Sequence, residues 1–444
     1  MNTARRVAAS ALVLALAAGL RPVSAEVYKA AETFEAVWTI VRDSHFDPAF
    51  DRAKWDRIGA ELRPKAAGAK TPGELRAVLA DMLGRLGLSH FAVIPSTPDS
   101  PTDRTNLSGH PGFDVRLIDK QIVVTEVDGD TAAAGVKPGW VVKSVAGTDV
   151  ATLLQGITEA TSPQVAQVEA WRVAIARLRG PANSPAEITF LDGGGAEVTK
   201  TIVRRSDTGE PVTVGSLPTM FVRVSSSTAT TPQGAKAGVI GFNVWMAAVD
   251  REFQIAIDRF RTADGIVIDL RGNPGGLAGM IMGLSGHFLK EPATLGVMTT
   301  KESQHPLKFN ANPRRVNASG QRVEPYGGPV AILVDGLTGS ASECFTGGMQ
   351  SLGRARVFGQ TSMGRALPAL FDKLPNGDVL IHAWGDFVTG TGVRIEGRGV
   401  VPDEPVALTR SALLAGRDPA LERALAWIDG ARTGSAAGRN SRQP

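Results

Sequence analysis

The sequence has a single cysteine, no long apolar run and little net charge, and each shortage excludes a class of protein. Cys344 is the only cysteine in 444 residues, so the chain cannot form an intramolecular disulfide and its core must be held together by burial. The apolar stretch from Val7 to Leu20 is shorter than the ~20 residues that span a bilayer, and no later stretch is long enough. We therefore expect a protein without stable membrane insertion.

Residues 1–25 have the pattern of a secretory signal peptide. Arg5 and Arg6 precede the apolar stretch, and Val23-Ser24-Ala25 is the small-residue pattern found before a cleavage site. We expect cleavage near Ala25 and export to the periplasm or the medium, with a retained N-terminal anchor as the alternative. Cleavage there removes three arginines and no acid, so the formal net charge falls from +4 to +1. The basic excess therefore gives no reason to expect a nucleic-acid partner.

The histidines show no metal-binding pattern, and we expect neither a metal nor another cofactor. None stands in an H-x-x-x-H or comparable spacing. The histidines outside the motifs discussed below are His45, His110, His287, His305 and His382. Cys344 could be a nucleophile near a helix start, but a small buried apolar residue is the commoner role for a lone cysteine.

The two ends of the mature chain differ in pattern. Residues 26–100 are predicted as an N-terminal helical segment, with Pro95–Asn106 as a polar linker, and residues 426–444 as a flexible tail of small polar side chains. Thr71-Pro72-Gly73-Glu74 is a good helix start, with proline at the first helical position. The expected helices are Thr33–Asp43, Ala53–Arg63 and Thr71–Leu86.

Residues 107–205 change to short strands and tight turns. Phe113–Ile118 and Gln121–Thr125 are predicted to form a strand pair, followed later by a helix at Ser162–Arg179 and a closing hairpin over Ala186–Val203. The block A-G-V-K-P-G-W-V-V at Ala134–Val142 resembles PDZ domains of the bacterial protease type. These domains usually carry Asp where this chain has Trp140, which is a mild departure.

The resemblance to a PDZ domain implies a peptide-binding loop. In such domains the loop before the first strand, here Gly109–Asp114, binds a peptide's terminal carboxylate, and the peptide adds as a strand. The residues implied are Gly112, Phe113 and Asp114. An ordinary glycine-rich turn is the alternative interpretation of this loop.

Residues 206–425 alternate apolar strands with helical stretches and predict an α/β core. Gly265–Leu270 is a continuous apolar run, typical of a strand buried on both faces. The other expected elements are a strand at Ala237–Phe242, helices at Val249–Thr262 and Leu277–Leu289, and an irregular polar stretch over residues 299–326.

The segment from Pro329 to Gln350 is the most informative part of the chain. The apolar run Val330–Val334 is followed by Gly339-Ser340-Ala341-Ser342-Glu343, which opens a helical run. A serine where a buried strand turns into a helix is exposed beside free helix N–H groups, which is how a fold presents a nucleophile. The same residues fit the capping box S-x-x-E, in which serine and glutamate hold a helix start. This segment alone leaves both interpretations open.

A glycine turn after the buried strand provides a second motif, Asp269–Gly276, which reads D-L-R-G-N-P-G-G. Its glycines let backbone N–H groups come close to a ligand, as an oxyanion requires. This motif, the Ser340 segment and Ile395–Asp403 (I-E-G-R-G-V-V-P-D) follow in the order found in the carboxy-terminal processing and tricorn-type serine peptidases, or tail-specific proteases. The chain resembles this family over nearly its whole mature length, including the F-D-P-A-F-D-R-A-K-W phrase of Phe46–Trp55. The resemblance implies a core of the crotonase-like type, shared with ClpP.

The chain departs from the family at the usual general base. Carboxy-terminal processing members pair the serine with a lysine in a G-x-x-x-x-G-K phrase, and the matching Gly359–Arg365 phrase ends in arginine. A guanidinium does not lose its proton at accessible pH, so Arg365 cannot act as a base. Arg365 is either a structural ion-pair partner or a docking charge for a substrate carboxylate.

The tricorn branch of the family uses a histidine instead, and its phrases are present. Ser89-His90 lies in L-G-L-S-H, which resembles the branch's L-G-x-S-H, and Glu396 lies in the later phrase. The resemblance implies that His90 takes the proton of Ser340 and that Ser89 relays between His90 and Glu396. An ordinary histidine at a helix end is the alternative for His90 alone. The oxyanion would be held by N–H groups of Ala341 and of Gly275 or Gly276.

The sequence therefore predicts an exported serine endopeptidase that acts on peptides or unfolded protein tails. A catalytically inactive, peptide-binding scaffold with the same fold is the alternative, because the lysine is missing. A third and weaker hypothesis is a core that binds a small hydrophobic ligand. The sequence does not determine the oligomeric state.

Overall fold

The computed structural model describes residues 29–96, 108–160, 162–215, 217, 219–301 and 306–440. The signal peptide predicted at residues 1–25 and most of the linker predicted at residues 95–106 lie outside the described residues. Among the residues described, no helix has both the length and the apolar character needed to cross a membrane.

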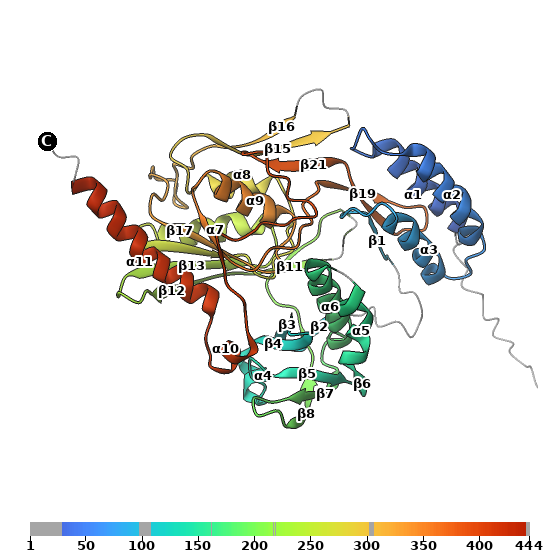
Figure 1. The fold of residues 1–444 in the computed structure, drawn as a ribbon, viewed down its shortest axis with the longest axis horizontal. Helices are drawn as coiled ribbons and strands as arrows, with labels where there is room; N and C mark the ends of the chain where they lie inside the picture. Colours follow the sequence, from blue (N-terminus) through green and yellow to red (C-terminus); the bar gives the residue numbers. More distant parts are fainter. Residues whose placement is uncertain are drawn as a thin grey trace, which may run out of the picture.

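Three helices form the N-terminal segment at one end of the molecule, and each overlaps one of the three predicted helices (Figure 1). The side chain of Asp51 accepts from Lys54 N–H at the start of the second helix, and Thr71 caps the third in the same way. Their apolar faces pack together around Phe34 and Trp55, which are both buried. The helices are α1 (Ala30–Ser44), α2 (Arg52–Ala67) and α3 (Pro72–Gly84).

Residues 108–206, called the middle domain, form a twisted sheet with two longer helices. The predicted strand pair is confirmed as β3 and β4, and the predicted closing hairpin as β7 and β8. The sheet order is β3-β4-β5-β7-β8, so β3 is an edge strand. The elements are β2 (Gly109–His110), β3 (Phe113–Ile118), β4 (Gln121–Val127), α4 (Gly129–Ala133), β5 (Val141–Val145), β6 (Thr148–Asp149), α5 (Val150–Ala160), α6 (Pro163–Leu178), β7 (Pro185–Leu191), β8 (Glu197–Val203) and β9 (Arg205–Ser206).

A six-stranded sheet of order β12-β13-β14-β17-β18-β22 forms the core. All its strands are parallel except β12, which pairs antiparallel at one edge. This arrangement fits the α/β pattern predicted for residues 206–425. The elements are β12 (Val224–Thr230), β13 (Lys236–Phe242), α7 (Ala248–Arg259), β14 (Gly265–Asp269), α8 (Met280–Ser285), β17 (Val330–Val334), α9 (Ala341–Ser351), β18 (Arg356–Gly359), β22 (Glu404–Pro405), α10 (Arg410–Leu414) and α11 (Pro419–Asn440).

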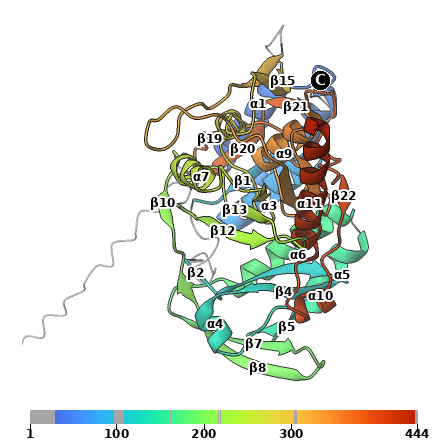
Figure 2. The ribbon, with the colours of Figure 1, turned by 90° about the vertical axis from the view of Figure 1, so that its left-hand side faces the viewer.

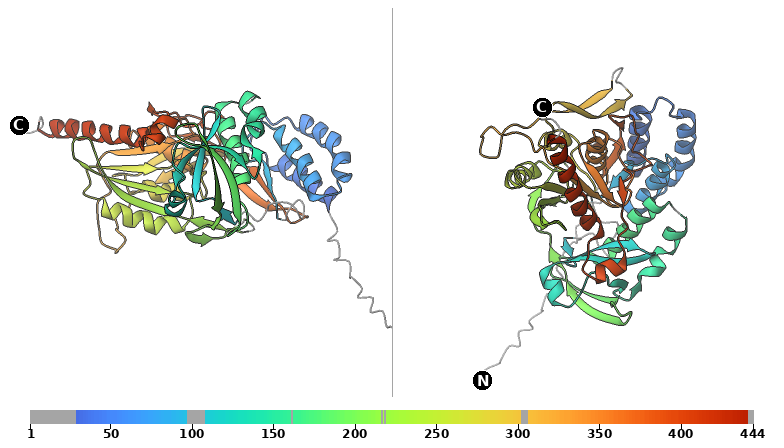
Figure 3. Two further views of the ribbon diagram at one scale, coloured as in Figure 1. Left: turned by 90° about the horizontal axis from the view of Figure 1, so that it is seen from below. Right: turned by 60° about the vertical axis from the view of Figure 1, so that its left-hand side comes forward.

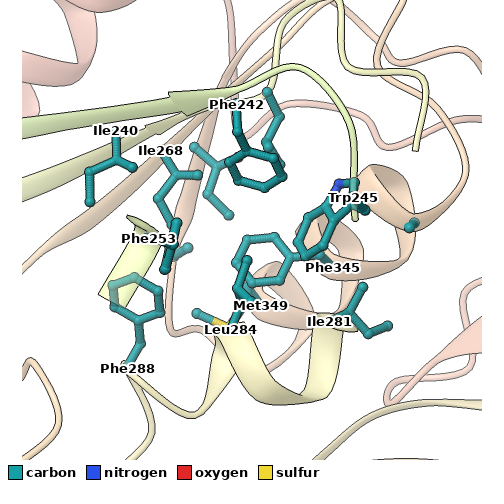
Figure 4. Packing of buried hydrophobic residues seen from close by; sticks show 14 of the residues in the cluster. Ile240, Phe242, Trp245, Phe253, Ile268, Ile281, Leu284, Phe288, Phe345 and Met349 are labelled. Atoms are coloured by element: carbon teal, nitrogen blue, oxygen red, sulfur yellow. The ribbon is translucent and has the colours of Figure 1, made fainter. Parts of the chain in front are cut away.

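Helices cover both faces of this sheet, which explains the continuous apolar runs of its strands. On one face, Trp245, Phe253 and Phe345 pack with β13 and β14 and with the helices α7 to α9 (Figure 4). On the other face lies α11, which is seen along its length in Figures 2 and 3. Its Ile428 is fully buried, and a Cβ added to Gly265 of β14 would lie 2.6 Å from it.

Smaller sheets join the segments. After the N-terminal helices, the chain adds β1 as a strand beside β20, so this segment is tied to the core by backbone pairing. A second small sheet has the order β16-β15-β21, and β10 pairs with β11. The strands are β1 (Ala92–Ile94), β10 (Glu210–Val212), β11 (Met220–Val222), β15 (Ala293–Thr300), β16 (Leu307–Ala311), β19 (Ala369–Lys373), β20 (Val379–Ala383) and β21 (Gly385–Thr389).

Three predicted elements differ in the structure. The helix expected over Leu277–Leu289 is reduced to the short α8, in a stretch interrupted by Gly279, Gly283 and Gly286. The stretch expected to be irregular contains β16 and the end of β15. The flexible tail expected at residues 426–444 is helical as far as residue 440, and its first part packs on the core through the buried Ile428 and Asp429.

Candidate active site

Ser340 lies where β17 turns into α9, and it has an unusual backbone conformation. Its φ is 51° and its ψ −119°, a combination that residues with a Cβ seldom adopt. Its N–H donates to Arg365 O at 2.8 Å and to Glu343 Oε2 at 3.0 Å. Ser340 and Glu343 form a capping box at this helix start, in which the Glu343 carboxylate accepts from Ser340 N–H. In the part of the chain that the structure describes, no group accepts the hydroxyl proton of Ser340, so this proton remains available.

The glycine turn after β14 lies directly against Ser340. A Cβ added to Gly275 would lie 2.6 Å from Ser340 Cβ and 2.9 Å from Ala341 N. The N–H of Gly275 donates to Asn273 Oδ1 at 3.0 Å. In the part of the chain that the structure describes, no group accepts from the N–H of Gly276 or of Ala341. Two backbone donors are thus available beside the serine.

Ser89, His90 and Glu396 form one hydrogen-bonded chain. Glu396 lies after β21, and its Oε1 accepts from Ser89 N–H at 2.9 Å. Its Oε2 accepts from the Ser89 hydroxyl at 2.9 Å, and Ser89 Oγ lies 2.8 Å from His90 Nδ1. Residues separated by more than three hundred positions in the sequence are therefore joined, as the sequence motifs predict.

The direction of these bonds fixes the tautomer of His90. A carboxylate only accepts, so the single hydroxyl proton of Ser89 goes to Glu396. Ser89 Oγ must then accept from His90 Nδ1–H, which leaves the lone pair on Nε2. Burial, together with the nearby Arg365 charge, lowers the pKa of His90 to about 4. The ring is therefore neutral near pH 7 and has a proton acceptor at Nε2.

The loop of residues 362–366 connects the serine side of the site to the histidine side. Glu343 is fully buried and accepts from the Ser362 hydroxyl and from the N–H groups of Gly364 and Arg365. The next residue, Ala366, donates its N–H to Glu396 Oε2 at 2.9 Å. Two carboxylates therefore hold this loop, Glu343 from the serine side and Glu396 from the histidine side.

Sequence reasoning missed the wider role of Glu343, which it treated only as a helix cap. The sequence signal for this role was the G-x-x-x-x-G phrase. Because the family places its base directly after this phrase, the backbone of the phrase must lie beside the nucleophile. Burial raises the pKa of Glu343 to about 7, against the effect of its four hydrogen-bond donors.

The surroundings of Arg365 and Cys344 indicate what each residue does. The Arg365 guanidinium lies 3.6 Å from Glu169 Oε1 of α6, so it has an ion-pair partner in the middle domain. Cys344 is buried, and burial raises the pKa of its thiol well above the ordinary value. A buried neutral thiol is a poor nucleophile, which leaves Ser340 as the better candidate.

The proposed nucleophile and base are not joined by a direct bond. Within the described residues, no hydrogen bond joins the Ser340 hydroxyl to the His90 ring.

The residues predicted to bind a peptide lie outside this site. Gly112, Phe113 and Asp114 lie in the middle domain, and the peptide-binding role expected of them stays a prediction. Gly112 has a φ of 78°, and a Cβ there would lie 2.2 Å from Thr131 Oγ1, so this loop requires glycine.

Two family models match the chain in separate segments. Residues 236–406 match the model described as Peptidase family S41, which includes the glycine turn, Ser340 and Glu396. Residues 27–84 match the model of the Tricorn protease C1 domain.

Curated relatives of both branches align with the chain. A carboxyl-terminal-processing protease of Picosynechococcus is 24% identical over 382 residues, which cover 83% of this chain and 81% of that protein. A putative tricorn protease homolog of Streptomyces coelicolor is 23% identical over 426 residues, or 91% of this chain but 33% of that protein. A probable CtpA-like serine protease of Staphylococcus haemolyticus is 29% identical over 142 residues, or 27% of that protein. The chain thus matches a third or less of the length of the last two.

Solved structures share the fold at low sequence identity. The photosystem II D1 C-terminal processing protease aligns with a TM-score of 0.53 and 20% identity, over 90% of this chain and 97% of that one. Mature CPAF in complex with lactacystin aligns with a TM-score of 0.60 and 13% identity, over 92% and 98%. The two family models therefore place residues 236–406 in peptidase family S41, a family of serine peptidases, and the N-terminal helices in the Tricorn protease C1 domain.

Proposed function

We propose that this chain is an exported serine endopeptidase with a tricorn-type site of Ser340, His90, Ser89 and Glu396. The observation that carries the proposal is the directed hydrogen-bond chain from Glu396 through Ser89 to His90, which leaves Nε2 as the acceptor. The position of the family's usual lysine is occupied by Arg365, which has no basic lone pair. Histidine is therefore the base that this site offers. The core would be of the crotonase-like type and the middle domain of the PDZ-like type.

The proposed reaction is acyl transfer from a peptide bond to Ser340. His90 Nε2 takes the hydroxyl proton as Ser340 Oγ attacks the carbonyl carbon, and His90 then gives this proton to the leaving amine. The acyl-enzyme is hydrolysed by water in the same way. The free N–H groups of Ala341 and Gly276 would bind the oxyanion, since that of Gly275 is already engaged by Asn273.

The Ser340 side chain and the His90 ring must approach each other for this reaction. Catalytic hydrogen bonds are often long or unformed without substrate and tighten in the complex. Both residues are anchored to the loop of residues 362–366, Ser340 through its N–H to Arg365 O and His90 through Ser89 and Glu396. The reaction therefore requires the two side chains to approach each other from backbones that are tied to one loop.

Labelling with a serine-directed fluorophosphonate tests the nucleophile. We expect the wild type to be labelled, Ser340→Ala to lose the label, and the exposed Ser319→Ala to keep it. For the base, we expect His90→Ala to lower kcat on a quenched fluorescent unfolded protein by about 10²–10⁴-fold, the usual contribution of general acid–base catalysis. Full activity of His90→Ala would mean that the histidine is not the base.

An inactive peptide-binding scaffold is the second candidate function. The observation that favours it is Arg365, because the lysine of the processing branch is absent. An unlabelled wild type that still binds unfolded protein would support the scaffold and reject the enzyme.

A further inference from the structure

Asp335, at the end of β17, connects the two loops of the proposed site. Its Oδ1 accepts from Gly272 N–H at 2.9 Å and from Leu337 N–H at 3.0 Å. Gly272 begins the glycine turn, and Leu337 lies in the loop that leads to Ser340. One carboxylate therefore sets the spacing between the proposed nucleophile and the proposed oxyanion donors.

Arg116 reaches this carboxylate from the middle domain. It lies on β3, and its Nε donates to Asp335 Oδ2 at 2.7 Å. A Cβ added to Gly272 would lie 2.6 Å from Arg116 Nη2, so the guanidinium also lies on the glycine turn itself. The side chains of Arg116 and Asp335 are 12% and 10% exposed, which leaves little water to screen the pair.

Helix α6 of the middle domain contacts the same loop one residue further on. A Cβ added to Gly336 would lie 3.1 Å from the Gln167 side chain. The middle domain therefore touches the loop before Ser340 at two successive residues. In Figure 1, α6 lies on the side of the middle domain that faces the core.

We propose that Arg116 is a positioning residue of the peptidase reaction, which holds the Gly272 turn and the loop before Ser340 in their working arrangement through Asp335. This inference rests on the proposed function. Arg116 touches no reacting atom; it acts by neutralising and orienting a carboxylate that would otherwise be buried without a cation. The middle domain is thereby a fixed part of the active site.

The charge environment of Asp335 supports this role. Burial by itself would raise the pKa of Asp335, but the Arg116 charge and the two N–H donors outweigh it and lower the pKa. Without Arg116, protonation of Asp335 becomes easier, and a protonated carboxyl group holds the two N–H groups less firmly.

Replacement of Arg116 tests the inference in the full-length protein. We expect Arg116→Met to lower kcat and the rate of fluorophosphonate labelling at least tenfold while KM changes less than threefold, and Arg116→Lys to recover part of the loss. Arg205→Met is the matched control, because Arg205 pairs with Asp128 and Asp130 inside the middle domain. We expect its kcat to stay within twofold of the wild type. If Arg116→Met does not fold, Asp335→Asn is measured in the same way, with the same loss expected.

The outcomes separate this inference from the proposed function. A wild type that is not labelled at Ser340 overturns the proposed function and this inference with it. A labelled wild type whose kcat and labelling rate survive in Arg116→Met overturns this inference alone. Equal losses in Arg116→Met and Arg205→Met overturn it as well, because they would show a general effect of weakening the middle domain.

Discussion

Both residues proposed to exchange a proton hold backbone conformations that are rare for residues with a side chain. Ser340 has a φ of 51° and His90 a φ of 57°. Such conformations cost roughly 1–3 kcal/mol each and persist only where the surroundings enforce them. At Ser340 the enforcing contacts are the bonds of its N–H to Arg365 O and Glu343. The strain is thus located where the proposed chemistry needs a fixed geometry.

As the pH falls, Glu343 is protonated before His90, so we expect Glu343 to determine the pH dependence of activity near neutral pH. Burial raises the pKa of Glu343 to about 7, whereas that of His90 is lowered to about 4. Below pH 7 Glu343 gains a proton, loses an acceptor site and holds the Gly364 and Arg365 N–H groups less firmly. We therefore expect kcat to fall as the pH falls through about 7. The pH–rate profile of the wild type and of Glu343→Gln checks this.

Two further measurements control this expectation. They are the shapes of the pH–rate profiles of the wild type and of Glu343→Gln, and the pH dependence of the free energy of unfolding. Glu343→Gln should have lower activity without the step near pH 7. Because the native state binds the Glu343 proton more tightly than the unfolded chain does, this residue makes the free energy of unfolding fall as pH rises from about 4.5 to about 7. A step near pH 7 that persists in Glu343→Gln would show that another group causes it.

At this scale the sequence predicted the residue types of the site but could not distinguish their bonds. The S-x-x-E pattern left Ser340 open between cap and nucleophile, and the structure forms the capping box while no described group accepts the proton of the Ser340 hydroxyl, so the two roles are compatible. The sequence also could not choose between Gly275 and Gly276, because the choice depends on the Asn273 side chain, which takes the N–H of Gly275. Such choices depend on side-chain rotamers, which the periodic pattern of apolar residues in the sequence does not determine.

At the scale of elements, local signals predicted the helices with clear starts and failed where the tertiary context decides. α2 and α3 begin at capping residues that are visible in the sequence. β16 was missed because it is an exposed strand that forms only by pairing with β15. The part of α11 from residue 426 onward was predicted as a flexible tail because its small polar residues hide the contact of Ile428 with Gly265 on β14.

The edge of β3 is already occupied by side chains of the chain itself. Val115 N–H donates to Asp114 Oδ1 at 2.8 Å, and Val115 O accepts from Arg116 Nη1 at 2.9 Å. Leu117 O accepts from Gln167 Nε2 at 2.9 Å. A peptide that added there as a strand would have to displace these groups. The peptide-binding interpretation of Gly112–Asp114 therefore competes with the Arg116–Asp335 contact.

We expect removal of these side chains to improve peptide binding. In the double variant Arg116→Met with Gln167→Ala, two backbone carbonyls lose partners worth about 1 kcal/mol each, so a peptide with a free carboxylate should bind at least about tenfold more tightly than to the wild type. Fluorescence anisotropy of a labelled C-terminal peptide measures this, with the amidated peptide as control. Equal affinity of the wild type and the double variant would show that the peptide does not use the edge of β3.

At the scale of the whole molecule, the site depends on how the N-terminal segment is attached to the core. Arg76 of α3 forms a bidentate pair with Asp378 at 2.6 and 2.9 Å, and their side chains are 9% and 0% exposed. Asp378 also accepts from Ser96 N–H at 2.8 Å, beyond β1. Ser89 and His90 lie between these two attachment points and are positioned by them.

Removal of this pair should affect both stability and activity. Arg76→Met leaves a buried carboxylate without its cation, and we expect the free energy of unfolding to fall by about 3–5 kcal/mol. We also expect kcat to fall, because the Ser89–Glu396 bonds lose their support. Denaturant unfolding and a kcat measurement check this, with Arg85→Met, which breaks an exposed pair with Glu61, as the control. An unchanged unfolding midpoint in Arg76→Met would contradict the expectation.

The separation of Ser89 and Glu396 along the chain has a consequence for the protein's synthesis. The hydrogen bonds that orient His90 need Glu396, which is made after the whole middle domain and most of the core sheet. A growing chain that already carries Ser340 therefore lacks the group that fixes the proposed base. The proposed reactive arrangement can arise only after residue 396 has been made, so the order of translation itself would delay proteolysis by chains that end before it.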